Sequence, residues 1–232
     1  MAEWRFLRGW SSEELRQRMA QVAGLGRNFE ALEEEISRDH GWHYTTSTAV
    51  IARDADDESF RRACNAVATY QFSDPSVVVA HFDPDAPLLQ RRLLLEVRVL
   101  GFRYLCPALV SHVREEPDTF GFRYDTLMGH IERGVEWFVV SRNTQGELTF
   151  HIEAYWQRGE LPNWWSAWGF ALLSGRYQRR WHHEGHRRMS LLATFGSTAR
   201  PPKDASGLAR HGIDDTFIYR REGHIRPWTR TH

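Results

Sequence analysis

Apolar and polar side chains alternate with a period of two from residue 77 to residue 157, as on strands that bury one face. The pattern divides into six expected strands, at residues 77–82, 92–100, 109–115, 119–126, 135–141 and 148–157. Their connections are short, and residues 143–146 (NTQG) have the composition of a hairpin loop. Because parallel neighbours need long crossover connections, this order predicts an antiparallel meander.

The alternation also predicts which face of each strand is buried. In residues 92–100, one face is apolar, and Glu96 and Arg98 lie on the other; the apolar positions are Leu93, Leu95, Val97 and Val99. Residues 148–157 repeat the pattern, with Phe150 and Ile152 opposed by Glu153. One apolar and one polar face is typical of an antiparallel sheet that is covered on one side only.

A long helix expected at residues 163–189 supplies that cover. Pro162 suits its start, and apolar residues at helical spacing follow, beginning with Trp164 and Trp165. The N-terminal part adds expected strands at residues 3–10 and 41–52 and helical segments at residues 28–38 and 57–71. A further helix begins at Ser11 and Glu14, which have capping-box spacing.

This order of elements predicts an α+β helix-grip fold, in which a curved antiparallel sheet wraps around a long C-terminal helix. Such a fold can leave a cavity between sheet and helix. We expect residues 1–189 to form this domain. Residues 190–232, with a net charge of +3, are interpreted as an extended C-terminal arm. Its apolar residues can anchor it to the body or to a partner subunit in a homo-oligomer; they are Phe217, Ile218, Tyr219 and Trp228.

Composition and charge argue against several classes of function. The chain has 30 basic and 30 acidic residues among 232, so it has no net positive field to attract nucleic acid. No apolar run is long enough to span a bilayer and no signal-peptide pattern opens the chain, which predicts a cytoplasmic protein without a membrane span. Cys64 and Cys106 match no metal or redox spacing and are interpreted as buried thiols.

Residues 121–138 (GFRYDTLMGHIERGVEWF) resemble the signature of an uncharacterised bacterial and plant family, the domain of unknown function nineteen-ninety. Members carry a segment like GFAYGTLPGHPERGEEXF, with X variable. The family is similar to the START-like helix-grip superfamily of lipid, hormone and polyketide binders and some cyclases, so the resemblance implies the same fold. The family has no established activity to transfer. Met128 and Ile131 stand here in place of two usual prolines.

Residues 126–136 of that segment are the first candidate site. His130 can give and take a proton near neutral pH, and Arg133 can hold an anionic group. Glu132 and Glu136 are candidate acids or bases. We expect His130 to act as a base, with Glu132 or Tyr124 assisting. The alternative is a structural hairpin in which these polar groups only satisfy one another.

The second candidate is the cavity itself, suited to an apolar ligand with a few polar contacts. Alternatively, the aromatic residues close the space and form a packed core. The residues expected to contact a ligand are Tyr124, Thr126, Arg133, Trp137, Phe150, Ile152, Trp165 and Trp168.

Two features of the C-terminal helix have ordinary explanations. His182 and His186 have i,i+4 spacing, but HHEGH does not match HExxH, so no metal site is predicted. A stripe of arginines beside Trp181 is typical of a charged outer face.

Together these observations predict a protein that binds a small apolar or amphipathic ligand without a cofactor; whether it also catalyses acid–base chemistry is left open. The alternative is a non-enzymatic interaction protein that uses the arginine-rich helix and the arm to bind a partner chain or nucleic acid.

Overall fold

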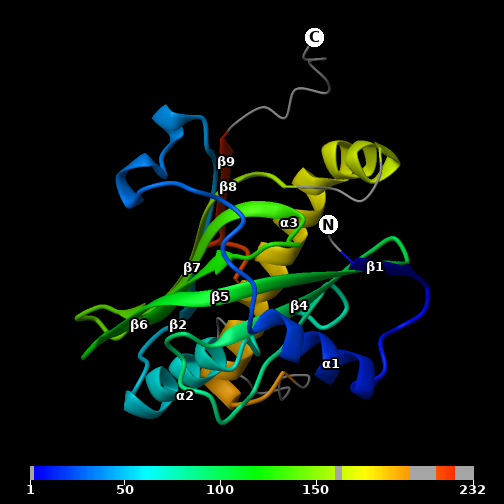
Figure 1. Ribbon diagram of the computed structural model, residues 1–232. Coiled ribbons are helices and arrows are strands. Elements are labelled where there is room, and N and C mark those ends of the chain that lie inside the picture. The colour runs from blue at the N-terminus through cyan, green and yellow to red at the C-terminus, as the bar shows by residue number, and fades with distance from the viewer. Residues whose placement is uncertain (1–2, 160–163, 199–212, 223–232) are drawn as a thin grey trace.

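The computed structural model describes residues 3–159, 164–198 and 213–222, with the backbone alone for residues 164–174. Within these residues, three α-helices accompany one antiparallel sheet (Figure 1). The helices are α1 (Ser12–Val22), α2 (Asp57–Ala68) and α3 (Trp164–Phe195). The strands are β1 (Glu3–Phe6), β2 (His43–Ala52), β3 (Val78–His81), β4 (Arg92–Val99), β5 (Phe102–Glu116), β6 (Thr119–Thr126), β7 (Glu132–Arg142), β8 (Leu148–Arg158) and β9 (Ile218–Glu222).

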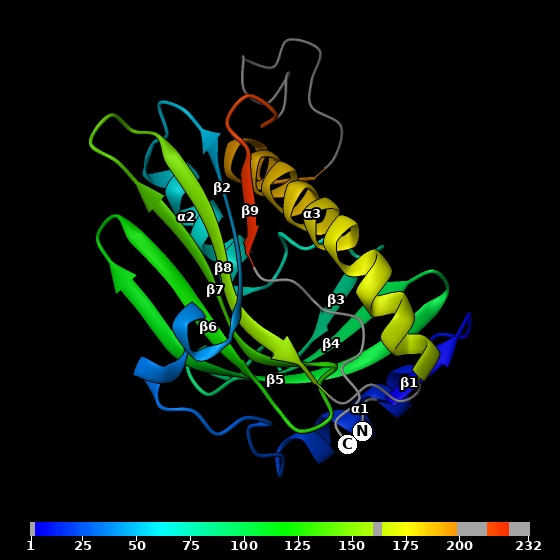
Figure 2. The ribbon, with the colours of Figure 1, turned by 90° about the horizontal axis from the view of Figure 1, so that it is seen from above.

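The sheet has the order β3-β4-β5-β6-β7-β8-β2-β9, with β1 paired to the first residues of β5. Strands β3 to β8 are therefore neighbours in sequence order, as the meander prediction requires. The sheet curves around α3, which crosses its concave face (Figure 2). The predicted α+β helix-grip architecture is confirmed.

Helices α3 and α2 share the concave face. Arg62 of α2 donates from Nε to the Ala193 carbonyl of α3 at 2.9 Å, and the Tyr177 hydroxyl of α3 donates to the Arg98 carbonyl at 3.0 Å. These bonds attach α3 to α2 near its C-terminal end and to β4 near its middle. The rings of Phe72, Phe138 and Phe150 fill the space beneath its C-terminal half.

The convex face is covered by the N-terminal segment. The predicted capping box is present, since the Glu14 amide donates to Ser11 Oγ and the Ser11 amide donates to Glu14 Oε2. Val22 then packs against Leu94 and Leu127 on the sheet. The face that sequence alternation describes as polar is thus partly covered as well.

The helix predicted at residues 28–38 is wrong: two 3-10 turns stand there, at Glu33–Glu35 and Arg38–His40. Asn28 is held on the sheet instead, because its amide donates to the Thr126 carbonyl at 3.2 Å and its Nδ2 to the Glu132 carbonyl at 2.9 Å. These long-range bonds compete with helix formation, and local sequence does not reveal them.

Strand β5 begins seven residues earlier than the expected start at residue 109. Leu100 and Gly101 have φ angles of 49° and 83°, which form a two-residue hairpin turn between β4 and β5. Pro107 lies inside the strand, and its carbonyl accepts from the Leu127 amide at 3.0 Å. Because proline is uncommon inside strands, the sequence pattern did not predict one continuous strand here.

The C-terminal region is partly integrated into the sheet. Helix α3 continues to Phe195, and β9 pairs with β2, placing Tyr219 opposite Ser47. Phe217 and Tyr219 pack their rings against histidines of α3, whereas Ile218 is largely exposed. Trp228 lies outside the described residues. The division of the chain after residue 189 into a domain and an arm stays a prediction.

Candidate functional site

A cavity of about 330 Å³ lies between the concave face of the sheet and α3. At its floor the aromatic core is closed: Phe72 lies 4.8 Å from Phe138 and 5.3 Å from Phe150 between ring centroids. The two alternatives from the sequence, an open cavity and a packed core, therefore both occur, at different ends of the same interface. Apolar side chains form much of the cavity wall, including Val77, Val78, Leu95, Val97, Val99, Leu100, Phe102 and Ile131.

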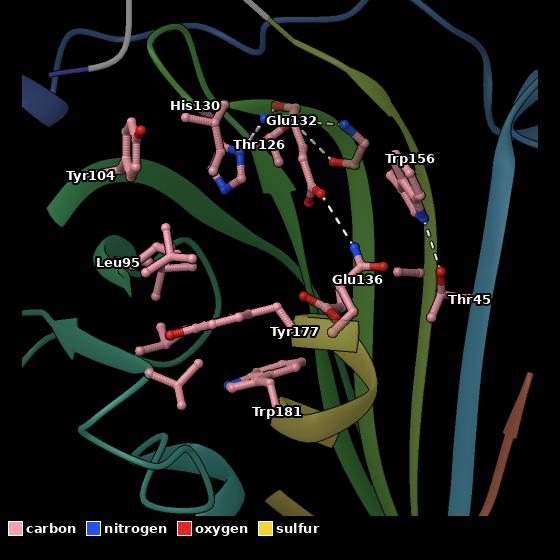
Figure 3. A pocket seen from close by; sticks show the side chains of 18 of the residues that line it. Thr45, Leu95, Tyr104, Thr126, His130, Glu132, Glu136, Trp156, Tyr177 and Trp181 are labelled. Carbon is pink, nitrogen blue, oxygen red and sulfur yellow. Dashed lines mark hydrogen bonds between the residues drawn. The ribbon is translucent and has the colours of Figure 1, made fainter. Parts of the chain in front are cut away.

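Polar groups gather at the end of the cavity formed by β7 (Figure 3). Glu132 and Glu136 project from this strand into the cavity, with Gly134 between them. A Cβ at Gly134 would meet the Tyr155 carbonyl oxygen at 2.1 Å, and its φ is 154°. Glycine is therefore required here for the close approach of β8.

Thr126 ties β6 to this part of β7. Its Oγ1 accepts from the Gly134 amide at 2.8 Å and donates to Asn28 Oδ1 at 2.6 Å. Thr126 itself is buried and lies on the cavity wall. These bonds hold the segment of β7 that carries the two glutamates.

Glu136 belongs to a chain of buried hydroxyl and carboxyl groups. The Tyr124 hydroxyl donates to Glu136 Oε2, and Tyr70 is hydrogen-bonded to Tyr124 in turn. Burial raises the pKa of Glu136 to about 8. The pKa of Tyr124 is raised well above its usual value, mainly by burial and also by the neighbouring Glu136. At neutral pH Glu136 therefore retains its proton in the folded protein.

Glu132 meets the helix at the same end of the cavity. Gln178 of α3 donates from Nε2 to Glu132 Oε1 at 3.3 Å. Burial raises the pKa of Glu132 to about 7, against the opposing field of Arg221. A carboxyl group that titrates near neutral pH can both release and accept a proton under physiological conditions.

His130 is buried and turns one edge of its ring toward the cavity (Figure 3). The Glu132 amide donates to its Nδ1 at 3.0 Å, and the Glu132 carbonyl is already bonded by Asn28. We therefore assign the ring proton to Nε2. Burial lowers the pKa of His130 to about 4, so the ring is neutral at pH 7. His130 thus offers a hydrogen-bond donor, and the geometry favours Glu132 over His130 as the base.

The structure brings together the three residues predicted as catalytic, His130, Glu132 and Tyr124. It does not bring Arg133 and Trp137 to the cavity. Their side chains alternate with those of Glu132 and Glu136 along β7 and therefore lie on the convex face. Arg133 is exposed there. The guanidinium carbon of Arg123 lies over the Trp137 ring, 5.9 Å from the ring centroid.

The remaining predicted ligand contacts divide into two groups. Phe150 and Ile152 are fully buried in the closed core, so they support the cavity without lining it. Trp165 and Trp168 belong to the first turns of α3, and their side chains lie outside the described part.

Sequence reasoning missed several residues of the cavity wall, among them Tyr70 and Gln178. Helical spacing could have indicated Gln178, because it is four residues before His182, just as Tyr177 is four residues before Trp181. All four of these residues line the cavity. Tyr70 had no comparable signal. It follows α2 with a φ of 58°, a conformation that local sequence does not predict.

His182 and His186 point toward Ser47 of β2. Ser47 Oγ lies 2.7 Å from His182 Nδ1 and 2.8 Å from His186 Nε2. Burial lowers the pKa of His182 to about 3, and burial also lowers the pKa of His186 well below its usual value. In the described part of the chain, no group of three histidine, cysteine or acidic residues is placed to hold a metal ion.

The part of the chain that forms the site also matches a known protein family. The model of the family described as Domain of unknown function (DUF1990) matches residues 28–188, which include every cavity-lining residue named above. The chain belongs to this family. A UPF0548 protein of Deinococcus radiodurans is 37% identical over 65 residues, which are 28% of this chain and 32% of that relative. That match therefore spans about a third of the relative's length.

Several solved structures resemble the fold at low sequence identity. A hypothetical protein from Helicobacter pylori aligns over 71% of this chain and 95% of its own, with 8% identity and a TM-score of 0.49. Human STARD10 aligns over 82% and 86%, with 8% identity and a TM-score of 0.40. Ginseng major latex-like protein 151 from Panax ginseng aligns over 61% and 99%, with 14% identity and a TM-score of 0.35.

These identities leave the ligand and any activity of this DUF1990 member to be argued from its own residues. Among the residues that the structure describes, no helix is long and apolar enough to cross a membrane.

Proposed function

We propose that this protein binds a small, largely apolar ligand in the cavity between the sheet and α3. The observation that carries the proposal is the cavity itself, a hollow of about 330 Å³ above a densely packed core. Protein interiors are otherwise close-packed, with few voids larger than a water molecule. An apolar wall with a few convergent polar groups is typical of small-molecule sites.

Native mass spectrometry of the purified protein tests the proposal. We expect a stoichiometric passenger, whose chemical class is then identified after extraction with organic solvent. Ligand-free protein prepared by the same extraction provides the second arm, in which apolar probes are titrated. An absence of passenger together with an absence of probe binding would contradict the proposal.

A matched pair of variants assigns binding to the cavity. Val97 lies on the cavity wall, so Val97→Phe reduces the free volume and should weaken binding. Val139 is a partly buried valine of β7 on the convex face, so Val139→Phe adds the same bulk without entering the cavity. Equal losses of binding in both variants would show that the ligand does not occupy the cavity.

Acid–base chemistry on the bound ligand is a second candidate function. It is favoured by Glu132, whose carboxyl faces the cavity and has a pKa raised to about 7 by burial. The test incubates the identified passenger with protein in deuterated water and follows carbon-bound hydrogen by NMR. Exchange that depends on the wild-type protein and is lost in Glu132→Gln supports proton transfer, and exchange at the same rate in both excludes Glu132 as the acid or base.

A further inference from the structure

We propose that the ligand carries a protonated amine, held at the β7 end of the cavity between the carboxyl groups of Glu132 and Glu136. This inference rests on the proposed function, because it names the chemical class of ligand for the same cavity. It follows from three properties of the wall: the sign of its charges, its balance of hydrogen-bond donors and acceptors, and its aromatic rings.

The ionisable groups of the wall are acids without a matching base. Among the described residues that line the cavity, none is a lysine or arginine. His130 and His182 line it, but burial lowers their pKa values to about 4 and about 3, so both rings are neutral at pH 7. An anionic ligand head would therefore be buried beside two carboxyl groups without a counter-ion, which is strongly unfavourable. A cationic head supplies the missing partner.

Arg221 acts on this end of the cavity from outside the wall. Its guanidinium lies over the Trp156 ring, 5.2 Å from the centroid, and its field lowers the pKa of Glu132 without overcoming the effect of burial. Arg221 thus acts on Glu132, one of the two carboxyl groups. The other titratable side chains that interact with these carboxyls are uncharged at neutral pH: Tyr70, Tyr124, Cys106, His130 and Tyr219.

At this end of the cavity, a buried hydrogen-bond acceptor remains open beside the donor that His130 offers. Gln178 Oε1 is buried without a hydrogen-bond partner, although its Nε2 donates to Glu132. Each carboxyl group uses one oxygen within the protein, Glu132 toward Gln178 and Glu136 toward Tyr124, and keeps a second. A primary ammonium group has three N–H donors and no acceptor, which matches this surplus.

Aromatic rings surround the same space. Tyr70, Tyr124, Trp156, Tyr177 and Trp181 all lie on the cavity wall. Cations are attracted to the faces of such rings, most strongly where water is excluded. Ring faces and carboxyl groups therefore favour the same ligand charge, while the aliphatic wall formed by β4 accommodates the apolar body of the ligand.

Amine binding has a consequence for protons. Burial raises the pKa values of Glu132 and Glu136 to about 7 and about 8, so the empty cavity holds at least one carboxyl proton at pH 7. An ammonium group favours the ionised carboxylates. Each carboxyl group that ionises loses its proton to the solvent while the amine keeps its own, so complex formation releases protons.

Isothermal titration calorimetry with three probes of one skeleton tests the inference: octylamine, octanol and octanoate. Ligand-free protein is titrated at pH 7 in two buffers of different ionisation enthalpy, which reports the protons released. We expect octylamine to bind at least about tenfold more tightly than octanol, with proton release, and octanoate to bind most weakly. The double variant Glu132→Gln, Glu136→Gln should lose the preference for octylamine and the proton release, and should keep its affinity for octanol.

Glu153→Gln is the matched control, since Glu153 is a β8 carboxyl bonded to Tyr44 and lies outside the cavity wall. It should retain the octylamine preference. Retained octanol binding in the double variant shows that its cavity is folded. Equal binding of octylamine and octanol, or an octylamine affinity that the double variant keeps, overturns the amine inference and leaves the proposed function standing. If none of the three probes binds and no passenger co-purifies with the protein, the proposed function is overturned as well.

Discussion

Replacing Glu136 by glutamine should stabilise the protein in alkaline solution and leave its stability near pH 5 almost unchanged. Burial raises the pKa of Glu136 from its ordinary value of 4.5 to about 8. Between these two values the folded state binds the proton more tightly than the unfolded chain does. The stability that Glu136 contributes is therefore fully present below pH 4.5 and is lost as the pH rises to about 8.

The magnitude follows from the interval between the two pKa values. A tenfold change in proton affinity corresponds to about 1.4 kcal/mol, so the pKa rise from 4.5 to about 8 sets an upper limit of about 5 kcal/mol. A carboxylate that faces a water-accessible cavity keeps part of its hydration, which reduces this cost. We expect Glu136→Gln to exceed the wild type in unfolding free energy by at least about 1.5 kcal/mol near pH 9. The amide oxygen can still accept the hydrogen bond from Tyr124.

Urea unfolding followed by circular dichroism at about pH 5, 7 and 9 measures the effect. Glu153→Gln is the control with the opposite sign. The hydrogen bond with His151 lowers the pKa of Glu153, so its contribution is present above pH 4.5 and is lost as the pH falls. That variant should be less stable than the wild type at neutral pH. If the difference between Glu136→Gln and the wild type is the same from about pH 5 to 9, Glu136 does not hold a proton in the folded cavity and the reasoning is refuted.

Three further predictions concern the framework around the cavity. Ser47→Ala removes the hydroxyl that bonds both His182 and His186. We expect the unfolding free energy, measured by urea titration, to fall by about 2–3 kcal/mol. An unchanged midpoint would mean that these bonds do not contribute to stability. Gly134→Ala places a Cβ 2.1 Å from the Tyr155 carbonyl oxygen of β8. The melting temperature should fall by an amount that corresponds to a loss of about 3 kcal/mol in unfolding free energy. A variant as stable as the wild type would show that β8 can move away. Phe138→Ala leaves a hole at the centre of the aromatic core. It should lower the unfolding free energy, measured by urea titration, by about 3–5 kcal/mol. A loss under about 1 kcal/mol would contradict the close packing of this core.

Local pattern and family signature determined much of this protein. The period-two stretch from residue 77 predicted the meander, because a strand that buries one face must alternate. The capping box at Ser11 and Glu14 predicted the start of α1, because both bonds are made within four residues. The segment at residues 121–138 indicated the family, and several of its residues, among them Tyr124, His130 and Glu132, meet in the cavity.

Tertiary structure alone decided which side chains share the site. Whether Glu132 or Arg133 faces the cavity depends on the register of β7 in the sheet, and shifting a strand by one residue exchanges its two faces. Tyr70 and Gln178 join the site from elements far apart in sequence.

The open cavity itself is likewise a tertiary property. The same concave face is closed by Phe72 and Phe138 at one end and open beside Leu95 and Glu136 at the other. The difference depends on where α2 and α3 cross the curved sheet. The sequence therefore determined the elements and their buried faces, whereas the distances between those faces, and with them the cavity, are set by packing of segments that no local pattern relates.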